Sequence, residues 1–104
     1  MRFLTIPELQ KSVLEFYVSR GWTRERVPLR SRILHLLEEA GELAGVVKYA
    51  EHNEFASADF EAELADVVLL AVACANEQGV DLGEIVWRKL RDNKRKYPAA
   101  RGAE

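Results

Sequence analysis

The sequence predicts an all-α protein built as a four-helix-type bundle. Apolar residues recur at intervals of three and four along most of the chain, and we find no alternating apolar–polar segment typical of a strand. Two segments open with residues that are typical of helix N-termini, at Thr5 and at Asp81. The segments between the predicted helices are mostly short, which favours antiparallel neighbours.

The first helix is expected to begin after Thr5 and to end near Gly21. Thr5-Ile6-Pro7-Glu8 is a capping-box pattern, in which Thr5 is the N-cap and Glu8 the third helical residue. Gly21 favours termination because glycine readily adopts the left-handed backbone conformation that follows many helices. The apolar side of this helix consists of Ile6, Leu9, Val13, Phe16 and Tyr17.

The second and third helices are expected to form the centre of the chain. The second is predicted over residues 29–50, with a break at His52-Asn53. Ser57 is the candidate N-cap of the third helix, which continues to residue 78, just before a glycine.

A fourth helix is predicted after Asp81, its candidate N-cap. It continues to Tyr97, where Pro98 ends it because the residue before a proline is disfavoured in the helical conformation. Residues 1–98 are then one all-α domain, and residues 99–104 are a flexible C-terminal tail.

The composition is that of a soluble globular protein, and it argues against several kinds of partner. The chain has 15 lysines and arginines against 17 aspartates and glutamates, so no surface for a nucleic-acid polymer is expected. It lacks the run of about 18 apolar residues that a membrane span requires. Residues 1–7 lack the apolar stretch of a signal peptide, so we expect a cytoplasmic protein. Cys74 is the only cysteine, which excludes an intramolecular disulfide and disfavours a cysteine-based zinc site.

The second helix carries three glutamates on one side. Glu39 and Glu42 are about 60° apart around the helix axis, and Glu38 and Glu42 are about 40° apart. No lysine or arginine follows Glu39 or Glu42 at the third or fourth position to pair with them. Because glutamate-rich helix faces are usually solvated surfaces, this pattern alone does not predict a site.

The third helix gives a stronger indication. Its residues 64–75 are nearly all apolar, so burial is expected, yet they include Asp66. A buried carboxylate needs a partner, because an unpaired one costs several kcal/mol or takes up a proton. Glu63, three residues earlier on the same face, is another acid and cannot satisfy Asp66, whereas a cation could. The alternative is a core aspartate that caps a helix or forms a salt bridge.

Two acidic pairs on separate helices predict a four-carboxylate cage for a divalent cation. Hard cations such as Mg²⁺, with Mn²⁺ as the second possibility, prefer oxygen ligands of this kind. Mg²⁺ usually retains waters and is completed by substrate phosphates, which favours phosphate chemistry. A di-iron or di-manganese bundle is disfavoured, because neither His35 nor His52 stands three residues after a glutamate.

Glu38-Glu39-x-x-Glu42 followed by Glu63-x-x-Asp66 resembles the signature of the MazG-like, all-α nucleoside triphosphate pyrophosphatases. Residues 37–44 are similar to the first motif helix of that family, and residues 63–67 to the second. Lys89-x-x-x-Asn93-x-Arg95-x-Tyr97-Pro98 is similar to a basic element near the family's C-terminus. The resemblance extends over residues 29–98.

This resemblance implies a helical bundle that assembles as a dimer or tetramer and cleaves a nucleoside triphosphate to the monophosphate and pyrophosphate, in nucleotide-pool house-cleaning. Glu38 and Glu39 are the implied catalytic residues. The implied metal ligands are Glu39, Glu42, Glu63 and Asp66. The implied substrate contacts are Lys89, Asn93, Arg95 and Trp22.

The resemblance leaves the nucleotide base open. Members that hydrolyse dCTP also carry a tryptophan before the first motif, but a histidine expected near residues 26–30 is missing here. Trp22 could stack on a base together with Phe16 and Tyr17, or all three could pack in the core or a subunit interface. His35 is expected to be a partly buried structural residue.

Two alternative functions remain open at this point. Phosphoribosyl-ATP pyrophosphatase is a related enzyme of similar length, although the basic element and Trp22 argue against it. A non-catalytic helical metal-binding or interaction module is the other, although all four ligand positions are acidic. In each case self-association as a homodimer or homotetramer is expected, since one short chain has few elements to cover the apolar third helix.

Overall fold

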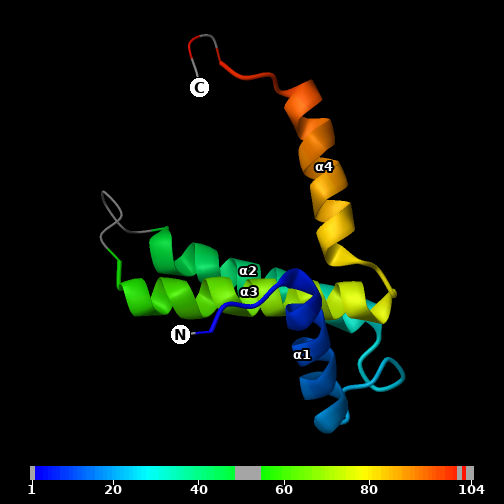
Figure 1. The fold of residues 1–104 in the computed structure, drawn as a ribbon. Helices are drawn as coiled ribbons and strands as arrows, with labels where there is room; N and C mark the ends of the chain where they lie inside the picture. The colour runs from blue at the N-terminus through cyan, green and yellow to red at the C-terminus, as the bar shows by residue number, and fades with distance from the viewer. Residues whose placement is uncertain (1, 49–54, 101, 103–104) are drawn as a thin grey trace.

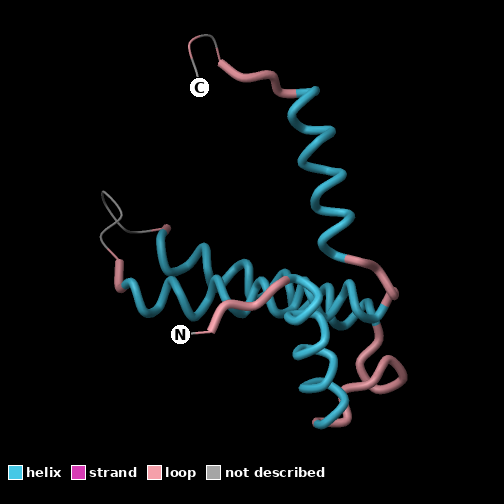
Figure 2. Tube along the Cα trace, viewed as in Figure 1, coloured by secondary structure: helices cyan, strands magenta, loops and turns pink. Residues whose placement is uncertain are grey.

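The computed structural model describes residues 2–48, 55–100 and 102. These residues form four helices and no strand, in the order α1 (Ile6–Ser19), α2 (Leu29–Val47), α3 (Ser57–Glu77) and α4 (Leu82–Lys96) (Figures 1 and 2). The predicted all-α fold is therefore confirmed. None of these helices is both long and apolar enough to cross a membrane.

The four helices form an open arrangement in which α2 and α3 are the central hairpin (Figure 1). α1 packs across α3, whereas α4 touches mainly α1 and projects away from the hairpin. The radius of gyration is 16.5 Å, whereas about 13 Å is typical of a compact domain of about 100 residues. A single chain is thus less closed than an ordinary four-helix bundle.

Two of the predicted helix starts are confirmed in atomic detail. Thr5 Oγ1 accepts a hydrogen bond from the backbone N–H of Glu8 at 3.2 Å, and Glu8 Oε1 accepts one from Thr5 N–H at 3.1 Å. Asp81 Oδ1 accepts from Glu84 N–H at 3.1 Å. The expected end of the first helix is also confirmed, because Gly21 has a positive φ of 73°.

The predicted N-cap of the third helix is wrong by one residue. Ala56 is the N-cap and Ser57 is the first helical residue, so no side chain caps this end. The cause is an aromatic contact: Phe55 and Phe60, with ring centroids 5.3 Å apart, occupy the positions of a hydrophobic staple around Ala56. Phe60 N–H also bonds to Ala56 O at 3.1 Å, which completes the first turn.

The predicted helix ends differ slightly from the observed ones. α2 ends at Val47 with Lys48 as C-cap, while Ala50 and the predicted break at His52-Asn53 lie outside the described residues. α3 and α4 each end one residue earlier than predicted. Part of the predicted tail, residues 101, 103 and 104, also lies outside the described residues, so the tail stays a prediction.

The core is small and lies where α1 crosses the C-terminal half of α3. Its buried residues are Val13, Val72 and Ala73, and Leu9 and Tyr17 pack against them. The part of α3 that precedes Leu70 is more exposed: Leu64, Val68 and Leu69 are 41%, 43% and 41% accessible. The expectation of a buried third helix therefore holds for only half of it, because one chain supplies too few elements to cover the rest.

A polar network sets the direction of α4. The Gln10 side-chain amide donates to Asn76 Oδ1 at 3.1 Å and to Val80 O at 2.9 Å. The same side chain accepts from Leu82 N–H at 3.0 Å, at the first residue of α4. Asn76 returns a hydrogen bond to Gln10 O at 2.9 Å. Because one glutamine links α1 to both ends of the short α3–α4 connection, α4 leaves the body at a defined angle.

Candidate active site

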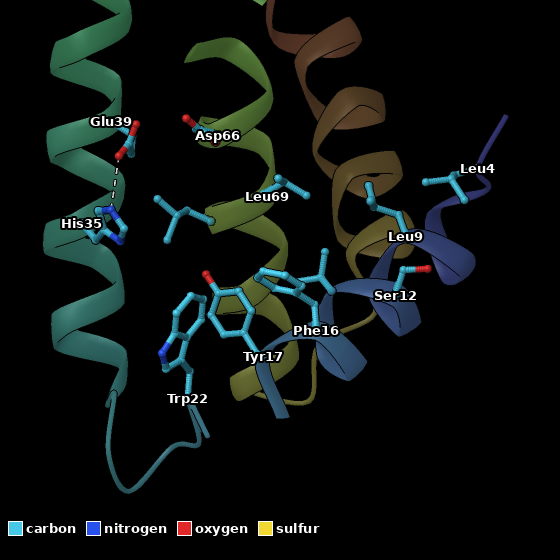
Figure 3. A pocket seen from close by; sticks show the side chains of 12 residues that line it. Leu4, Leu9, Ser12, Phe16, Tyr17, Trp22, His35, Glu39, Asp66 and Leu69 are labelled. Carbon is cyan, nitrogen blue, oxygen red and sulfur yellow. Dashed lines mark hydrogen bonds and ion pairs between the residues drawn. The ribbon is translucent and has the colours of Figure 1, made fainter. Parts of the chain in front are cut away.

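Three carboxylates meet between α2 and α3. Glu39 extends from α2, and Glu63 and Asp66 extend from successive turns of α3. Each offers an oxygen atom that lies within 4.8 Å of the oxygens of the other two. Figure 3 shows Glu39 and Asp66 facing one another across the two helices. The three-residue spacing within α3 is what turns both of its acids toward α2.

The electrostatics of this group suit a cation. One oxygen of Glu39 and one of Glu63, Oε2 in both, are buried and have no hydrogen-bond partner among the described residues. Loss of water raises the pKa of Glu63, and the nearby charges of Glu42 and Glu39 raise it further. A divalent cation would supply the opposite charge and the ligand bonds that both buried oxygens lack. The residues present therefore fit a hard metal ion.

The two other predicted acids, Glu42 and Glu38, are not part of this cluster. Glu42 is exposed and is not one of the three clustered carboxylates, although its charge acts on Glu63. Glu38 is also exposed, and it does not belong to the cluster. Asp66 is exposed as well, contrary to the burial expected from its apolar helix. Its membership of the cluster consequently rests on geometry and not on the cost of burying a charge.

A largely apolar cavity of about 420 Å³ adjoins the carboxylates. Its aromatic wall consists of Phe16 and Tyr17 from α1 and Trp22 from the following loop, and Glu39 and Asp66 line its other end (Figure 3). The Trp22 ring meets Tyr17 edge-on at 5.3 Å and Phe16 at 5.7 Å between centroids. The predicted aromatic group thus borders the acidic group directly, with one apolar and one charged end in the same cavity.

His35 lies between the aromatic and acidic parts of this cavity, which the sequence did not lead us to expect. Its side chain is 55% exposed, and its Nε2 is 3.2 Å from Glu39 Oε1. The prediction of a partly buried structural histidine is therefore wrong. The spacing of four residues between His35 and Glu39 is the signal that could have identified the contact.

The predicted phosphate-binding residues lie on α4, away from the carboxylates of the same chain. Lys89, Asn93 and Arg95 belong to a helix that packs mainly against α1 and points away from the α2–α3 hairpin (Figure 1). No α4 residue borders the cavity beside Glu39 and Asp66. Within one chain, the structure does not bring the predicted substrate contacts on α4 to the acidic group.

Comparison with known sequences identifies the family. Residues 28–99 match the MazG nucleotide pyrophosphohydrolase domain. The chain belongs to the MazG nucleotide pyrophosphohydrolase family. The matched segment contains α2, α3 and α4, and hence every predicted metal ligand. This membership favours the nucleoside triphosphate prediction over phosphoribosyl-ATP pyrophosphatase.

Several curated relatives in the MazG family are similar over most of this chain. Human dCTP pyrophosphatase 1 is 32% identical over 103 residues, which cover 91% of this chain and 60% of the human protein. The bovine and mouse proteins of the same name are each 30% identical over 102 residues, or 90% of this chain. The chain spans about three fifths of the length of these relatives.

Proposed function

We propose that this chain hydrolyses a nucleoside triphosphate to the nucleoside monophosphate and pyrophosphate, as a nucleotide-pool enzyme of the MazG family. The observation that carries the proposal is the group of Glu39, Glu63 and Asp66, with oxygens within 4.8 Å of one another. Two of their oxygens are buried and have no hydrogen-bond partner in the part of the chain that the structure describes. An aromatic-lined cavity opens directly beside that group. A divalent cation and a nucleotide are the ligands that suit the two halves of this site.

Glu39, Glu63 and Asp66 would hold the cation, which we propose to be Mg²⁺, with Mn²⁺ as a substitute. Glu42, whose charge already acts on Glu63, is the proposed fourth ligand. When bound, such an ion polarises a phosphate and lowers the pKa of a water ligand. The proposed role of the carboxylates is to fix its position, and that of Glu38 with Glu39 is to orient the attacking water.

The aromatic wall is the proposed site of the nucleobase. Trp22, Tyr17 and Phe16 present apolar ring surface on which a base can stack, in a cavity whose size is usual for a small-molecule ligand. The triphosphate would then extend toward Glu39 and Asp66 at the other end. Because the similar curated proteins are named for dCTP, cytosine nucleotides are the first substrates to try.

We also propose that the protein works as a homodimer or homotetramer. The accessible surface is 8424 Å², whereas a compact monomer of 11.8 kDa exposes about 5,900 Å². The excess, about 2,500 Å², exceeds the area of roughly 800 Å² that each partner buries in a standard interface. Large apolar residues on α2 and α4 are among those exposed, including Leu37 at 69% and Leu90 at 52%.

In such an assembly, we propose that Lys89, Asn93 and Arg95 contact the phosphates bound by the carboxylates of a second copy. The direction of α4, away from its own hairpin, supports this arrangement.

Mixing Asp66→Asn chains with Lys89→Ala chains tests whether the site is shared between two copies. If the site is shared, random mixing restores roughly a quarter of wild-type turnover, because half the dimers are mixed and each has one intact site. If mixing restores nothing while each variant still assembles, the shared site is refuted.

The proposed activity is tested with a panel of canonical and modified nucleoside triphosphates, dCTP first, in the presence of Mg²⁺. Products are separated so that monophosphate with pyrophosphate is distinguished from diphosphate with orthophosphate. We expect the first pair in equal amounts, and none after EDTA. Release of orthophosphate, or no hydrolysis of any nucleotide by folded protein, would overturn the proposal.

A further inference from the structure

Arg32 is a buried charged residue with a relative accessibility of 5%, and it takes no part in the site proposed above. Its side chain is 6% exposed, and that of Glu77 is 4% exposed. Arg32 Nε lies 3.2 Å from Glu77 Oε2. Long charged side chains are rarely buried this deeply unless they are paired and hydrogen-bonded. The contacts made by the guanidinium group indicate what this burial achieves.

The guanidinium group ties the α1–α2 loop to α3 through backbone carbonyls. Nη2 donates to Trp22 O at 2.9 Å, and Nε donates to Val27 O at 2.9 Å, so both ends of the loop are held. Nη1 donates to Ala73 O on α3 at 3.2 Å. The Nε hydrogen is directed to Val27 O, and Glu77 Oε2 has no hydrogen-bond partner among the residues that the structure describes. Glu77 therefore acts on Arg32 mainly through its charge.

The same group also supports the aromatic wall of the cavity from behind. The guanidinium carbon lies 5.0 Å from the centroid of the Tyr17 ring, a cation–π distance. Tyr17 in turn meets Trp22 edge-on, and both rings border the large cavity beside the carboxylates. Arg32 does not line that cavity; it lines a smaller one of about 210 Å³ on the other side of Trp22 and Tyr17. Its effect on a base in the larger cavity would therefore act through these two rings.

We propose that Arg32 is a positioning residue for base recognition, because it fixes the Trp22 loop and the Tyr17 ring in the arrangement that a nucleobase would stack on. This inference rests on the proposed nucleotide-binding function. It requires arginine specifically, because the three carbonyls are reached from three different nitrogens of the planar guanidinium, whereas the donors of a lysine ammonium all lie on one nitrogen. Binding then does not have to order Trp22 and Tyr17, which would otherwise reduce the affinity.

The test compares Arg32→Lys with wild-type protein, using the nucleotide of the panel that has the lowest KM. Lysine leaves Glu77 with a positive partner but releases the loop carbonyls. A second variant, Arg32→Met/Glu77→Leu, removes both charges and is expected to fold even if lysine is not tolerated, because buried ion pairs can often be replaced by apolar residues of similar volume. Arg30→Lys, at an exposed position of the same helix, is the matched control.

Both Arg32 variants should raise KM for the nucleotide by about five- to tenfold, because the aromatic side chains must then be ordered on binding. The kcat value and the inhibition constant of Mg²⁺-tripolyphosphate, a ligand without a base, should change little. If Arg32 only stabilised the fold, the variants would have a lower melting temperature, and binding of the nucleotide and of tripolyphosphate would change equally. Equal loss for both ligands, or no change in KM in the folded variants, would overturn the inference.

A fluorescence readout keeps this test independent of turnover. In a Trp87→Phe background, Trp22 is the only tryptophan, and freeing its loop should shift its emission maximum in both Arg32 variants but not in Arg30→Lys. An unchanged emission maximum would contradict the positioning role directly. Absence of turnover in the wild-type protein, by contrast, would refute the proposed activity while the emission result still decides whether Arg32 holds Trp22.

Discussion

At the scale of single residues, Glu63 shows the electrostatic problem of this site most clearly. One of its oxygens is buried and has no hydrogen-bond partner within residues 2–48, 55–100 and 102. Loss of water, together with two neighbouring glutamates, raises the pKa of its carboxyl group. Asp66 belongs to the same group but is exposed, so water can solvate its charge. The two α3 acids should therefore behave alike toward a metal and differently in its absence.

Glu63→Gln should lower turnover by roughly a hundredfold or more, because the amide lacks the charge that would hold the cation. Without metal, the same change should raise the melting temperature, since one source of repulsion and one partly buried charge are removed. Glu61→Gln, two residues earlier on α3 and exposed, is the matched control and should alter neither quantity. Thermal unfolding in EDTA and turnover in Mg²⁺ provide the two measurements. Near-normal turnover of a destabilised Glu63→Gln protein would refute the ligand role.

Asp66→Asn should cause a similar loss of turnover with little change in metal-free stability. The exposed carboxylate has no burial cost to relieve, so the stabilisation expected for Glu63→Gln should be absent or small. The two variants are compared by melting in EDTA. If Asp66→Asn were destabilised and retained its turnover, Asp66 would be a structural residue and not a metal ligand.

The raised pKa of Glu63 also predicts how the metal-free protein responds to pH. A carboxyl group whose pKa is higher in the folded state stabilises the fold while it is protonated, and this contribution is lost as the pH rises through the folded-state pKa. Lowering the pH from neutral toward the ordinary pKa of a glutamate should therefore stabilise wild-type protein in EDTA relative to Glu63→Gln. Melting curves of both proteins across this range test the difference. Parallel pH profiles would show that Glu63 does not titrate abnormally.

Much of the acidic group could be predicted from the sequence, because helical spacing places Glu63 and Asp66 on one face. The burial argument for Asp66 was wrong, since the degree of burial depends on how many helices one chain can place around α3. Arg32 could not be identified in advance either. Its partners, Ala73 and Glu77, lie at the far end of another helix, and sequence periodicity does not specify contacts of that kind.

At the scale of secondary-structure elements, local side-chain chemistry determines where the helices begin. Thr5 and Asp81 cap their helices through the hydrogen bonds that the sequence predicts. The start of α3 was misplaced because the Phe55–Phe60 contact favours Ala56 as N-cap over the neighbouring serine. The orientation of α4 was also not predictable, since it depends on the tertiary contacts of Gln10 with Asn76 and Val80.

The exposed apolar residues of α4 predict that this helix takes part in self-association. Leu90 is 52% exposed on a helix that is otherwise rich in charge. Leu90→Lys should weaken the assembly. It should leave the helical content of the chain unchanged, because Leu90 does not belong to the hydrophobic core of Val13, Val72 and Ala73. Asp92→Lys, which adds a lysine at another exposed position of α4, is the control. Sedimentation equilibrium should show a lower mass for Leu90→Lys alone, and an unchanged mass would contradict this role of α4.

At the scale of the whole molecule, the chain combines an open shape with a small core. The surface in excess of that of a compact monomer, the half-covered α3 and the outward direction of α4 are consistent with assembly of several copies. The sequence predicted the helices, but it could not predict how far apart one chain holds its carboxylates and its basic helix. That separation follows from the α1–α4 contacts.

Mg²⁺ should stabilise the fold as a whole. A ligand that binds only the native state adds about 2.7 kcal/mol at a hundredfold excess over its dissociation constant. The melting temperature should therefore rise in millimolar Mg²⁺ and fall on addition of EDTA, and the rise should be smaller in Glu63→Gln. Sodium chloride at equal ionic strength is the control for general screening of the carboxylates. If Mg²⁺ and sodium chloride have the same effect, the acidic group does not bind the ion specifically.

The most direct test of the central claim is pyrophosphate release from the best nucleotide of the panel, measured as free Mg²⁺ is varied. The carboxylate site predicts a saturable dependence on Mg²⁺ in wild-type protein, no release in EDTA, and a loss of roughly a hundredfold or more in Glu63→Gln and Asp66→Asn at saturating Mg²⁺. The control Glu61→Gln should follow the wild-type curve. Release that persists in EDTA, or that is the same in all four proteins, would contradict the assignment of catalysis to this group.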